Sequence, residues 1–291
     1  MRFPKAEPLF AVRRRRNTLA FSPLQRVKIL LNVFDYEYNS KERKSPMNSP
    51  SNLVVCMGAG ADKEEASALA NRIGVPLSDE KGSELTLMTD SSGITLMGYG
   101  LSYRGDFEQM LYRLTKGRVR HEMLIHAAKT KLDRQTAVDA TAGMGEDSIL
   151  LAAYGYNVIM FEQNAVIAEL LKDAIKRAKQ NPQLADIMER MHLIEGNSID
   201  LMPRLDVSPD LIYLDPMFPA RQKSGLINKK LQLIQKLEQP CVEEEKLFNA
   251  ANLAQPKKII VKRPLKGRVL AERKPSYSIK GKAIRYDCYV L

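Results

Sequence analysis

One short segment combines residue types that a protein core does not need. Residues 211–225 read LIYLDPMFPARQKSG, so four apolar residues lead directly into Asp215 and Pro216. A planar exocyclic amine is a poor nucleophile, because its lone pair is delocalised into the ring. Asp215 and the Pro216 carbonyl could each accept one N–H of such an amine, which would orient the nitrogen and favour the positive charge that develops during attack. The segment predicts a site for group transfer to such a nitrogen, with Asp215 and Pro216 in catalytic roles.

Phe218, which follows in the same segment, extends this interpretation. Its ring could stack on a base, an interaction that contributes about 1–3 kcal/mol in other base-binding sites. The tetrapeptide alone has a second interpretation, in which Asp-Pro ends a strand and Phe218 belongs to the core. A glycine turn elsewhere in the sequence favours the first interpretation, in which Asp215, Pro216 and Phe218 form a site.

That glycine turn lies in the segment VDATAGMGEDS. It predicts a strand that ends at Asp139, a turn through Gly143 and Gly145, and a helix that begins near Asp147. The next predicted strand ends at Glu162, nineteen residues after Gly143. Glycines let a backbone approach a ligand closely, and an acid at this distance can accept both hydroxyls of a ribose. The pattern predicts a nucleoside-containing ligand in contact with Asp139, Gly143, Gly145 and Glu162, whereas Gly-x-Gly alone would also fit an ordinary tight turn.

The start of the predicted helix distinguishes between nucleoside ligands. A dinucleotide-binding sequence has a third glycine at the position of Ser148. Its pyrophosphate binds at the helix start, where this chain has Glu146 and Asp147. Two carboxylates would repel a diphosphate and tolerate a cation, so S-adenosylmethionine fits better than a dinucleotide. Helix capping would also explain the two acids. Asn197 and Ser198, after the third predicted strand, are expected to bond the adenine edge.

Cations surround the predicted base-binding segment. Arg221 and Lys223 follow Phe218, and Lys262 and Arg263 end the next predicted strand. Scattered lysines usually mark a solvated surface. Cations concentrated near a base-binding loop are better interpreted as phosphate contacts that position RNA.

The elements that position these residues alternate between strand and helix. Five short apolar runs, TAVDATAG, YNVIMFEQ, MHLIEGNS, DLIYLDP and KKIIVKRP, are separated by helical segments. This alternation predicts an α/β fold with a doubly wound, mostly parallel sheet that is covered on both faces. The fourth strand should lie next to the first, so that Asp215 opens onto the crevice at the topological switch point. The final segment, SYSIKGKAIRYDCYVL, predicts a hairpin.

A smaller α+β unit is expected before this sheet. LVVCMG predicts a strand, KEEASALANRIG a helix closed by Gly74, and ELTLMTDSSGITLMGYG two strands around a turn. Two helices, DFEQMLYRLT and RVRHEMLIHAAKTKL, should follow. We expect the small unit at residues 47–115 and the larger domain at 116–291. Residues 1–46 are expected to be disordered or an upstream extension before a start at Met47, and a basic RNA-binding arm is the alternative.

Composition and charge exclude several classes of protein. The chain has 291 residues, and no apolar run is long enough to cross a bilayer, so we expect a soluble, cytoplasmic protein. Three cysteines far apart suit a reducing compartment, and two histidines five residues apart do not match the zinc-protease pattern, so no metal is expected. Residues 1–46 carry +7 of the net charge of +11, which leaves +4 for the remainder. Bulk charge of the folded part therefore argues only weakly for a nucleic acid.

The segments DATAGMGEDS, FEQN, IYLDPMFPARQKSG and IIVKRP closely resemble the ribosomal RNA small subunit methyltransferase J family, over roughly residues 47–291. The resemblance implies a class I, Rossmann-like methyltransferase that uses S-adenosylmethionine and releases S-adenosylhomocysteine. It implies methylation of the exocyclic N2 of a guanine near the 3′ end of 16S rRNA, as naked RNA or in the small ribosomal subunit. No membrane and no obligate protein partner are expected.

The resemblance also implies a set of cofactor contacts. These fall on Glu146, Asp147, Glu162, Gln163, Asn197, Ser198 and Asp215. The family pattern has Arg, Arg and Ser where this chain has Glu146, Gln163 and Asn197. These departures keep the acids, so they bear on cofactor affinity rather than on activity.

Two other functions stay open from the sequence. DNA adenine and protein glutamine N-methyltransferases also place an acid or amide, a proline and an aromatic residue at this strand end. They usually have Pro-Pro where this chain has Pro216-Met217. The third possibility is a protein that binds S-adenosylmethionine or RNA without catalysis, and the intact Asp215 and Phe218 argue against it.

Overall fold

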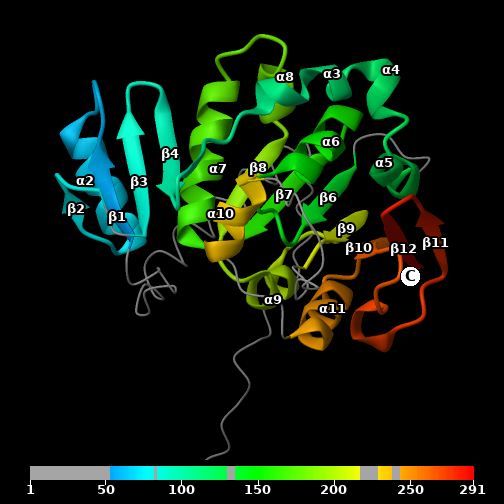
Figure 1. Cartoon of the computed structure of the whole chain (residues 1–291). Coiled ribbons are helices and arrows are strands. Elements are labelled where there is room, and N and C mark those ends of the chain that lie inside the picture. The colour runs from blue at the N-terminus through cyan, green and yellow to red at the C-terminus, as the bar shows by residue number, and fades with distance from the viewer. Residues whose placement is uncertain (1–52, 82–83, 130–134, 217–228, 238–242) are drawn as a thin grey trace, which may run out of the picture.

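The structure, a computed structural model, contains two sheets that lie side by side (Figure 1). The expected extension at residues 1–46 lies outside the described residues. The residues described are 53–81, 84–129, 135–216, 229–237 and 243–291.

The larger sheet has seven strands. They are β6 (Thr136–Asp139), β7 (Asn157–Glu162), β8 (Met191–Glu195), β9 (Leu211–Leu214), β10 (Lys258–Pro264), β11 (Tyr277–Lys280) and β12 (Ile284–Val290). Their order is β11-β12-β10-β9-β6-β7-β8, and β6 to β10 are parallel. The antiparallel strands β12 and β11 form the predicted hairpin at one edge. The predicted fold class is confirmed, because β9 lies beside β6 and the strand order reverses between them.

Helices cover both faces of this sheet. They are α5 (Met123–Ala128), α6 (Glu146–Tyr154), α7 (Ala165–Ala178), α8 (Ala185–Met188), α9 (Ser198–Leu201) and α11 (Glu244–Leu253). Successive strand residues point to opposite faces. In β10, Ile260 joins the core under α5 and α6, whereas Ile259 and Val261 join the core under α9 and α11. Because both faces are buried, these strands are continuously apolar rather than alternating.

The smaller sheet has the order β2-β1-β3-β4-β5. Its elements are β1 (Leu53–Met57), α2 (Lys63–Ile73), β2 (Leu77–Ser78), β3 (Leu85–Asp90), β4 (Gly93–Gly98) and β5 (Leu101–Tyr103). The three predicted strands and the predicted helix are confirmed, and Gly74 ends α2 in the left-handed conformation with φ 70°. The short strands β2 and β5 were not predicted. The boundaries at residues 47 and 115 stay predictions.

The segment between the sheets contains several short helices. The structure has η1 (Phe107–Met110), α3 (Leu111–Leu114) and α4 (Lys116–Val119) before α5. The first predicted helix forms η1 and α3 without a gap and ends as predicted at Thr115, where the backbone becomes extended (ψ 141°), whereas extended backbone at Glu122 (ψ 133°) interrupts the second. Among the described residues, no helix is long and apolar enough to cross a membrane.

The smaller sheet packs on α7 together with α10 (Lys229–Leu237), and a single buried core includes residues from all of them. An ion pair fixes this contact, because Arg72 of α2 donates two hydrogen bonds to Glu169 of α7 at 3.0 and 2.8 Å. The Glu169 side chain is only 4% exposed. Burial raises its pKa, but Arg72 and Lys172 outweigh this effect, so the pKa lies below its usual value of 4.5.

Replacing Arg72 with methionine is expected to lower the free energy of unfolding by about 1–3 kcal/mol, because Glu169 loses its main partner. A carboxyl whose folded-state pKa is lowered stabilises the fold above its unfolded pKa, and this contribution is lost as the pH falls. The difference between wild type and variant in urea unfolding should therefore be full at neutral pH and shrink below about pH 4.5. The control Lys176→Met loses only an exposed 3.7 Å contact with Glu65, so it should change stability by less than about 0.5 kcal/mol. Equal effects of both variants would contradict this account.

Candidate functional site

The carboxyl ends of β6 and β9 lie side by side in the larger sheet. Asp139 ends β6, and Asp215 comes directly after β9. Thr141 joins the two ends, because its hydroxyl accepts a hydrogen bond from the Asp215 N–H at 2.7 Å and its own N–H donates to Asp139 at 3.1 Å. Sequence reasoning did not single out Thr141, since its type does not distinguish it from other turn residues. The Thr141 residue therefore links the carboxyl ends of β6 and β9 in addition to the hydrogen bonds of the sheet.

Asp139 is fully buried behind this junction. Ser148, at the position of the third glycine of a dinucleotide site, donates to its carboxylate at 2.5 Å. Burial raises the pKa of Asp139 to about 7, although the bonds from Ser148 and Thr141 lower it. The prediction that Asp139 contacts the cofactor directly needs correction, because none of its surface is exposed. Its carboxylate holds the glycine turn instead.

The glycine turn contains one open and one crowded glycine. Gly143 has φ 52°, and a Cβ built there would meet nothing within 4 Å. Gly145 has φ 75°, and a Cβ there would lie 2.9 Å from Leu171 of α7. Positive φ favours glycine at both positions. Gly145 thus allows α6 to begin close to α7, whereas Gly143 leaves open space against the backbone.

Glu162, at the end of β7, lies against this turn. Its carboxylate accepts the Gly143 N–H at 2.9 Å and the Asn164 N–H at 2.7 Å. The residue is 6% exposed, and burial raises its pKa above the usual value despite the backbone hydrogen bonds. A carboxylate offers about four acceptor positions, so Glu162 retains capacity for further donors.

A lysine lies between two carboxylates beside the switch point. Lys262 of β10 places its Nζ 2.8 Å from Asp147 and 2.9 Å from Asp215. The Tyr213 hydroxyl donates to the same Asp147 oxygen at 2.6 Å. Burial lowers the pKa of Lys262, but the two carboxylates raise it more, so the net shift is upward. For Asp215 burial has the largest effect and raises its pKa, which Lys262 opposes.

The two cations predicted as phosphate contacts on β10 differ in exposure, and the prediction for Arg263 needs correction. Lys262 is 26% exposed at its side chain and contacts two carboxylates of the site. Arg263 is 4% exposed and donates to the Arg268 carbonyl and to Glu244. A buried and paired guanidinium cannot reach a phosphate at the surface. Phe218, Arg221 and Lys223 lie outside the described residues.

The remaining predicted contacts lie at or near helix starts. Glu146 and Gln163 are exposed, and Ser198 is buried. Asn197 caps α9 by accepting the Ile199 N–H at 2.9 Å. Pro216, directly after Asp215, is buried. The structure therefore brings Asp147 and Asp215 into one network, with the turn of Gly143 and Glu162 at the neighbouring strand ends.

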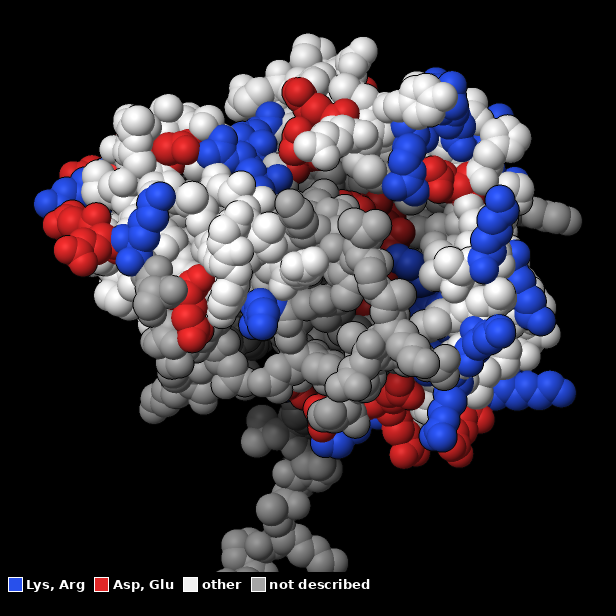
Figure 2. Space-filling view, in the orientation of Figure 1, with Lys and Arg blue, Asp and Glu red and all other residues white. Residues whose placement is uncertain are grey.

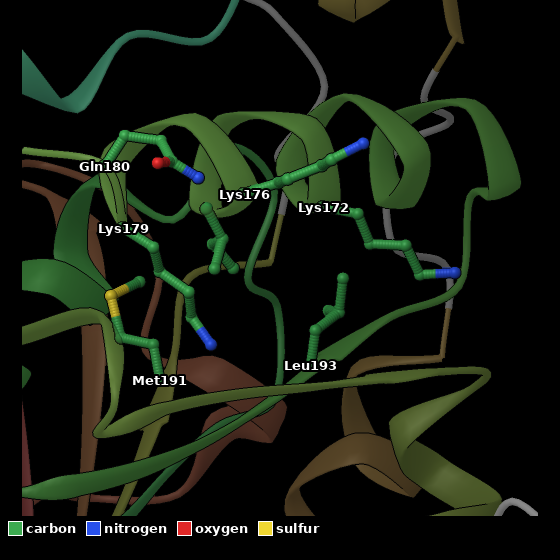
Figure 3. Close-up of a pocket in the computed structure, with 7 residues that line it drawn as sticks. Lys172, Lys176, Lys179, Gln180, Met191 and Leu193 are labelled. Carbon is green, nitrogen blue, oxygen red and sulfur yellow. The ribbon is translucent and has the colours of Figure 1, made fainter. Parts of the chain in front are cut away.

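A cavity of about 390 Å³ lies elsewhere, between α7 and β8. Figure 3 shows lysine side chains of α7 extending across it, above Met191 and Leu193. Each lysine is paired with a carboxylate, Lys176 with Glu65 at 3.7 Å and Lys179 with Glu189 at 3.2 Å, while Lys172 contacts Glu195 and Glu169. None of the predicted site residues lines this cavity. It is therefore an open groove beside an edge strand and not the candidate site.

Comparison with known proteins agrees with the fold. A family model described as a putative SAM-dependent methyltransferase matches residues 69–291. A crystal structure of a SAM-dependent methyltransferase from Neisseria gonorrhoeae is 29% identical, with a TM-score of 0.65 over 81% of this chain and 95% of that chain. Fold and site together define an S-adenosylmethionine-dependent methyltransferase.

Curated relatives identify the family within this class of methyltransferases. Ribosomal RNA small subunit methyltransferase J from Thioalkalivibrio sulfidiphilus is 37% identical over 78% of this chain and 93% of its own length. The proteins of that name from Pseudomonas aeruginosa and Neisseria gonorrhoeae are 35% and 38% identical, over 83% and 74% of this chain and 95% and 88% of their own. The chain belongs to the ribosomal RNA small subunit methyltransferase J family, which confirms the resemblance seen in the sequence.

The residues present fit S-adenosylmethionine. Gly143 has a positive φ and open space where a Cβ would lie, so a ligand could approach its backbone closely. Glu162 lies directly beside it with acceptor capacity for ribose hydroxyls. The acids Glu146 and Asp147 at the start of α6 suit a cationic ligand rather than a diphosphate. Gly143, Glu162 and the first turn of α6 are therefore the residues that would hold the cofactor.

Proposed function

We propose that this protein transfers a methyl group from S-adenosylmethionine to the exocyclic N2 of a guanine in 16S rRNA, in the cytoplasm. Three relatives of the same family carry a ribosomal RNA name, and the chain spans nearly their whole length. The observation that carries the proposal is the position of Asp215 at the carboxyl end of β9. This carboxylate lies at the switch point, one third exposed and paired with the partly buried cation of Lys262.

Asp215 is the proposed acceptor for the guanine amine. The cofactor, when bound, supplies an electrophilic methyl group on a sulfonium. The Asp215 carboxylate accepts one N–H of the amine and favours the positive charge that develops on nitrogen. The Pro216 carbonyl is proposed to accept the other N–H, and Phe218 to stack on the base. In-line attack needs no Lewis acid, so the proposal includes no metal.

Lys262 is proposed to position Asp215 rather than to bind phosphate. Its ammonium group, between Asp147 and Asp215, keeps the Asp215 carboxylate ionised and restricts its orientation. The three groups together carry a net charge of −1, which favours a cationic cofactor and a developing ammonium. Arg221 and Lys223 stay proposed RNA contacts.

Glu162→Gln is expected to raise the Kd for S-adenosylmethionine at least about tenfold, because a charged acceptor for the ribose is lost. Isothermal titration calorimetry measures this without turnover. The matched control is Glu195→Gln, since Glu195 occupies the equivalent register on the neighbouring strand β8 and contacts Lys172 on α7. The control should leave the Kd within about twofold. Similar losses in both variants would remove Glu162 from the proposed contacts.

The proposal is tested with methyl-labelled S-adenosylmethionine and four substrates in parallel. These are unmodified small ribosomal subunits, naked 16S rRNA, duplex DNA and bulk protein, and the labelled product is digested and identified by mass. N2-methylguanosine from either ribosomal substrate supports the proposal and shows which form is used. Label in DNA adenine or protein glutamine moves the protein to that chemistry. Cofactor binding without transfer to any substrate favours a non-catalytic binding protein.

A further inference from the structure

The excess positive charge after residue 46 is concentrated in one short segment. Residues 264–283 contain six Lys or Arg and one Glu, a net charge of +5, while residues 47–291 together carry only +4. All six cations are exposed. We propose that they form a docking surface for the RNA phosphate backbone, here named the C-terminal basic surface. Its residues are Lys266, Arg268, Arg273, Lys274, Lys280 and Lys282.

Buried arginines hold the loop that carries the first two of these cations. The Arg285 guanidinium donates to the carbonyls of Pro264, Leu265 and Gly267 at 3.0, 2.9 and 3.0 Å. It is itself paired with buried Asp287 at 2.8 Å. On the other side Arg263 donates to the Arg268 carbonyl. Buried side chains therefore hold the backbone of this loop, and the Lys266 and Arg268 side chains are exposed to solvent.

Further contacts place the other cations along the same C-terminal hairpin. The Leu265 N–H donates to the Ala283 carbonyl at 2.9 Å, which places the loop beside the hairpin turn with Lys280 and Lys282. The Tyr289 hydroxyl donates to the Arg273 carbonyl at 2.8 Å. Figure 2 shows Lys and Arg side chains over the right-hand part of the molecule, where Figure 1 places β11 and β12. Lys266, Lys280 and Lys282 thus lie together at the carboxyl end of β10, and Arg273 and Lys274 extend the basic surface toward the other end of the hairpin, where the Ser276 N–H donates to the Cys288 carbonyl.

This surface adjoins the proposed reaction site. Lys262, which contacts Asp215, precedes Lys266 by four residues along β10 and the loop. Four residues of chain span at most about 14 Å, so RNA held here can reach the site with a neighbouring nucleotide. Tyr277 of β11 is 42% exposed and adds an aromatic ring to the surface.

The composition of the surface favours RNA over a protein partner. Protein interfaces have an apolar centre, whereas dispersed Lys and Arg around one or two aromatic rings are typical of contacts with phosphates and unpaired bases. Glu272 is the one acid in residues 264–283. The inference rests on the proposed function for the identity of the RNA, while the surface itself is defined by charge and geometry.

A triple variant tests the proposal. Lys266, Arg268 and Lys282 are replaced together by alanine, and the control replaces three exposed lysines of other elements, Lys63, Lys176 and Lys179, by alanine. Each variant loses three positive charges, so a bulk charge effect would be equal in both. Filter binding to naked 16S rRNA at several salt concentrations gives the Kd and its salt dependence. Transfer of labelled methyl groups gives KM and kcat for the same RNA.

The surface variant should bind RNA at least about tenfold more weakly than the control, and the slope of log Kd against log salt should fall by about 2. Its KM for RNA should rise in parallel, with kcat and the Kd for S-adenosylmethionine within about twofold of wild type. Equal affinity of both variants would overturn the docking surface while leaving the proposed function intact. Unchanged RNA affinity with a loss of activity only on assembled subunits would also overturn it, since the surface would then contact protein. Lack of methylation by wild type, with the surface effect on binding preserved, would instead overturn the proposed function.

Discussion

Replacing Asp215 with asparagine is expected to lower the rate of methyl transfer by about 10²–10³-fold, and replacement with alanine should abolish it. The amide keeps one oxygen acceptor but has no charge to favour the developing ammonium on the guanine nitrogen. RNA affinity should stay within about twofold, because phosphate contacts supply most of it. Single-turnover transfer of labelled methyl groups, with RNA binding measured separately, distinguishes the two effects.

The matched control for this prediction is Asp186→Asn on α8. Asp186 lies outside the strand-end network, so its replacement should leave the rate within about twofold. Thermal unfolding of each variant shows whether the loss of a Lys262 partner disturbs the fold. Turnover that survives in folded Asp215→Ala would refute the proposed mechanism.

Replacing Lys262 with methionine is expected to move the acidic limb of the pH–rate profile upward by at least about one pH unit. Lys262 lowers the pKa of Asp215, against burial that raises it. Without this cation the Asp215 pKa rises further, so a smaller fraction is ionised at any given pH. The rate at a fixed pH on the acidic limb should then fall about tenfold or more, and the loss should recover as the pH rises. A simple loss of stability would lower the rate at every pH instead.

Two further variants separate the positioning role from a general effect of charge. Lys262→Arg retains a cation between the carboxylates and should restore the wild-type pH limb, with a reduced rate because the planar guanidinium differs in shape. Lys258→Met removes a lysine from the other end of β10, where it donates to backbone carbonyls of Ala127 and Lys129. This control should not shift the profile. A shift of equal size would show that Lys262 acts only through net charge.

Local sequence patterns predicted much of the site because its parts follow directly from strand ends. The turn needs positive φ at Gly143 and Gly145, and such positions favour glycine. Glu162 follows a continuous apolar strand, so its position at the neighbouring strand end could be inferred from spacing alone. In the structure, Glu162 accepts a hydrogen bond from the N–H of Gly143, nineteen residues earlier in the chain, so the two strand ends lie beside each other.

The partners of charged side chains could not be inferred in this way. Lys262 and Asp147 are 115 residues apart, and only the packing of β10 against β9 and of β9 against β6 brings them together. From the sequence, Lys262 and Arg263 are two adjacent cations at a strand end. In the sheet their side chains point to opposite faces, Lys262 to the site and Arg263 to Glu244 on α11.

One missed residue could have been found from strand periodicity. Tyr213 and Asp215 are two positions apart, so their side chains project to the same side of an extended chain. A buried tyrosine requires a partner for its hydroxyl, and the acids near the switch point were the available acceptors. The break before α5 had no such signal, because Glu122 is not a helix breaker.

The loop after β10 separates the residues that shape the C-terminal basic surface from those that would touch RNA. Arg285 donates to three carbonyls of this loop from Nη1 while its Nε and Nη2 donate to Asp287, a division that needs the planar fork of a guanidinium and that the single nitrogen of a lysine cannot reproduce. Exposed cations such as Lys266 and Arg268 need only supply charge. Across relatives, substitution should therefore be tolerated at the exposed positions, with Lys and Arg exchanging freely or moving along the loop, while position 285 admits arginine alone. The exposed cations can then change to fit an RNA of a different shape, while the fold of the loop and hairpin stays the same.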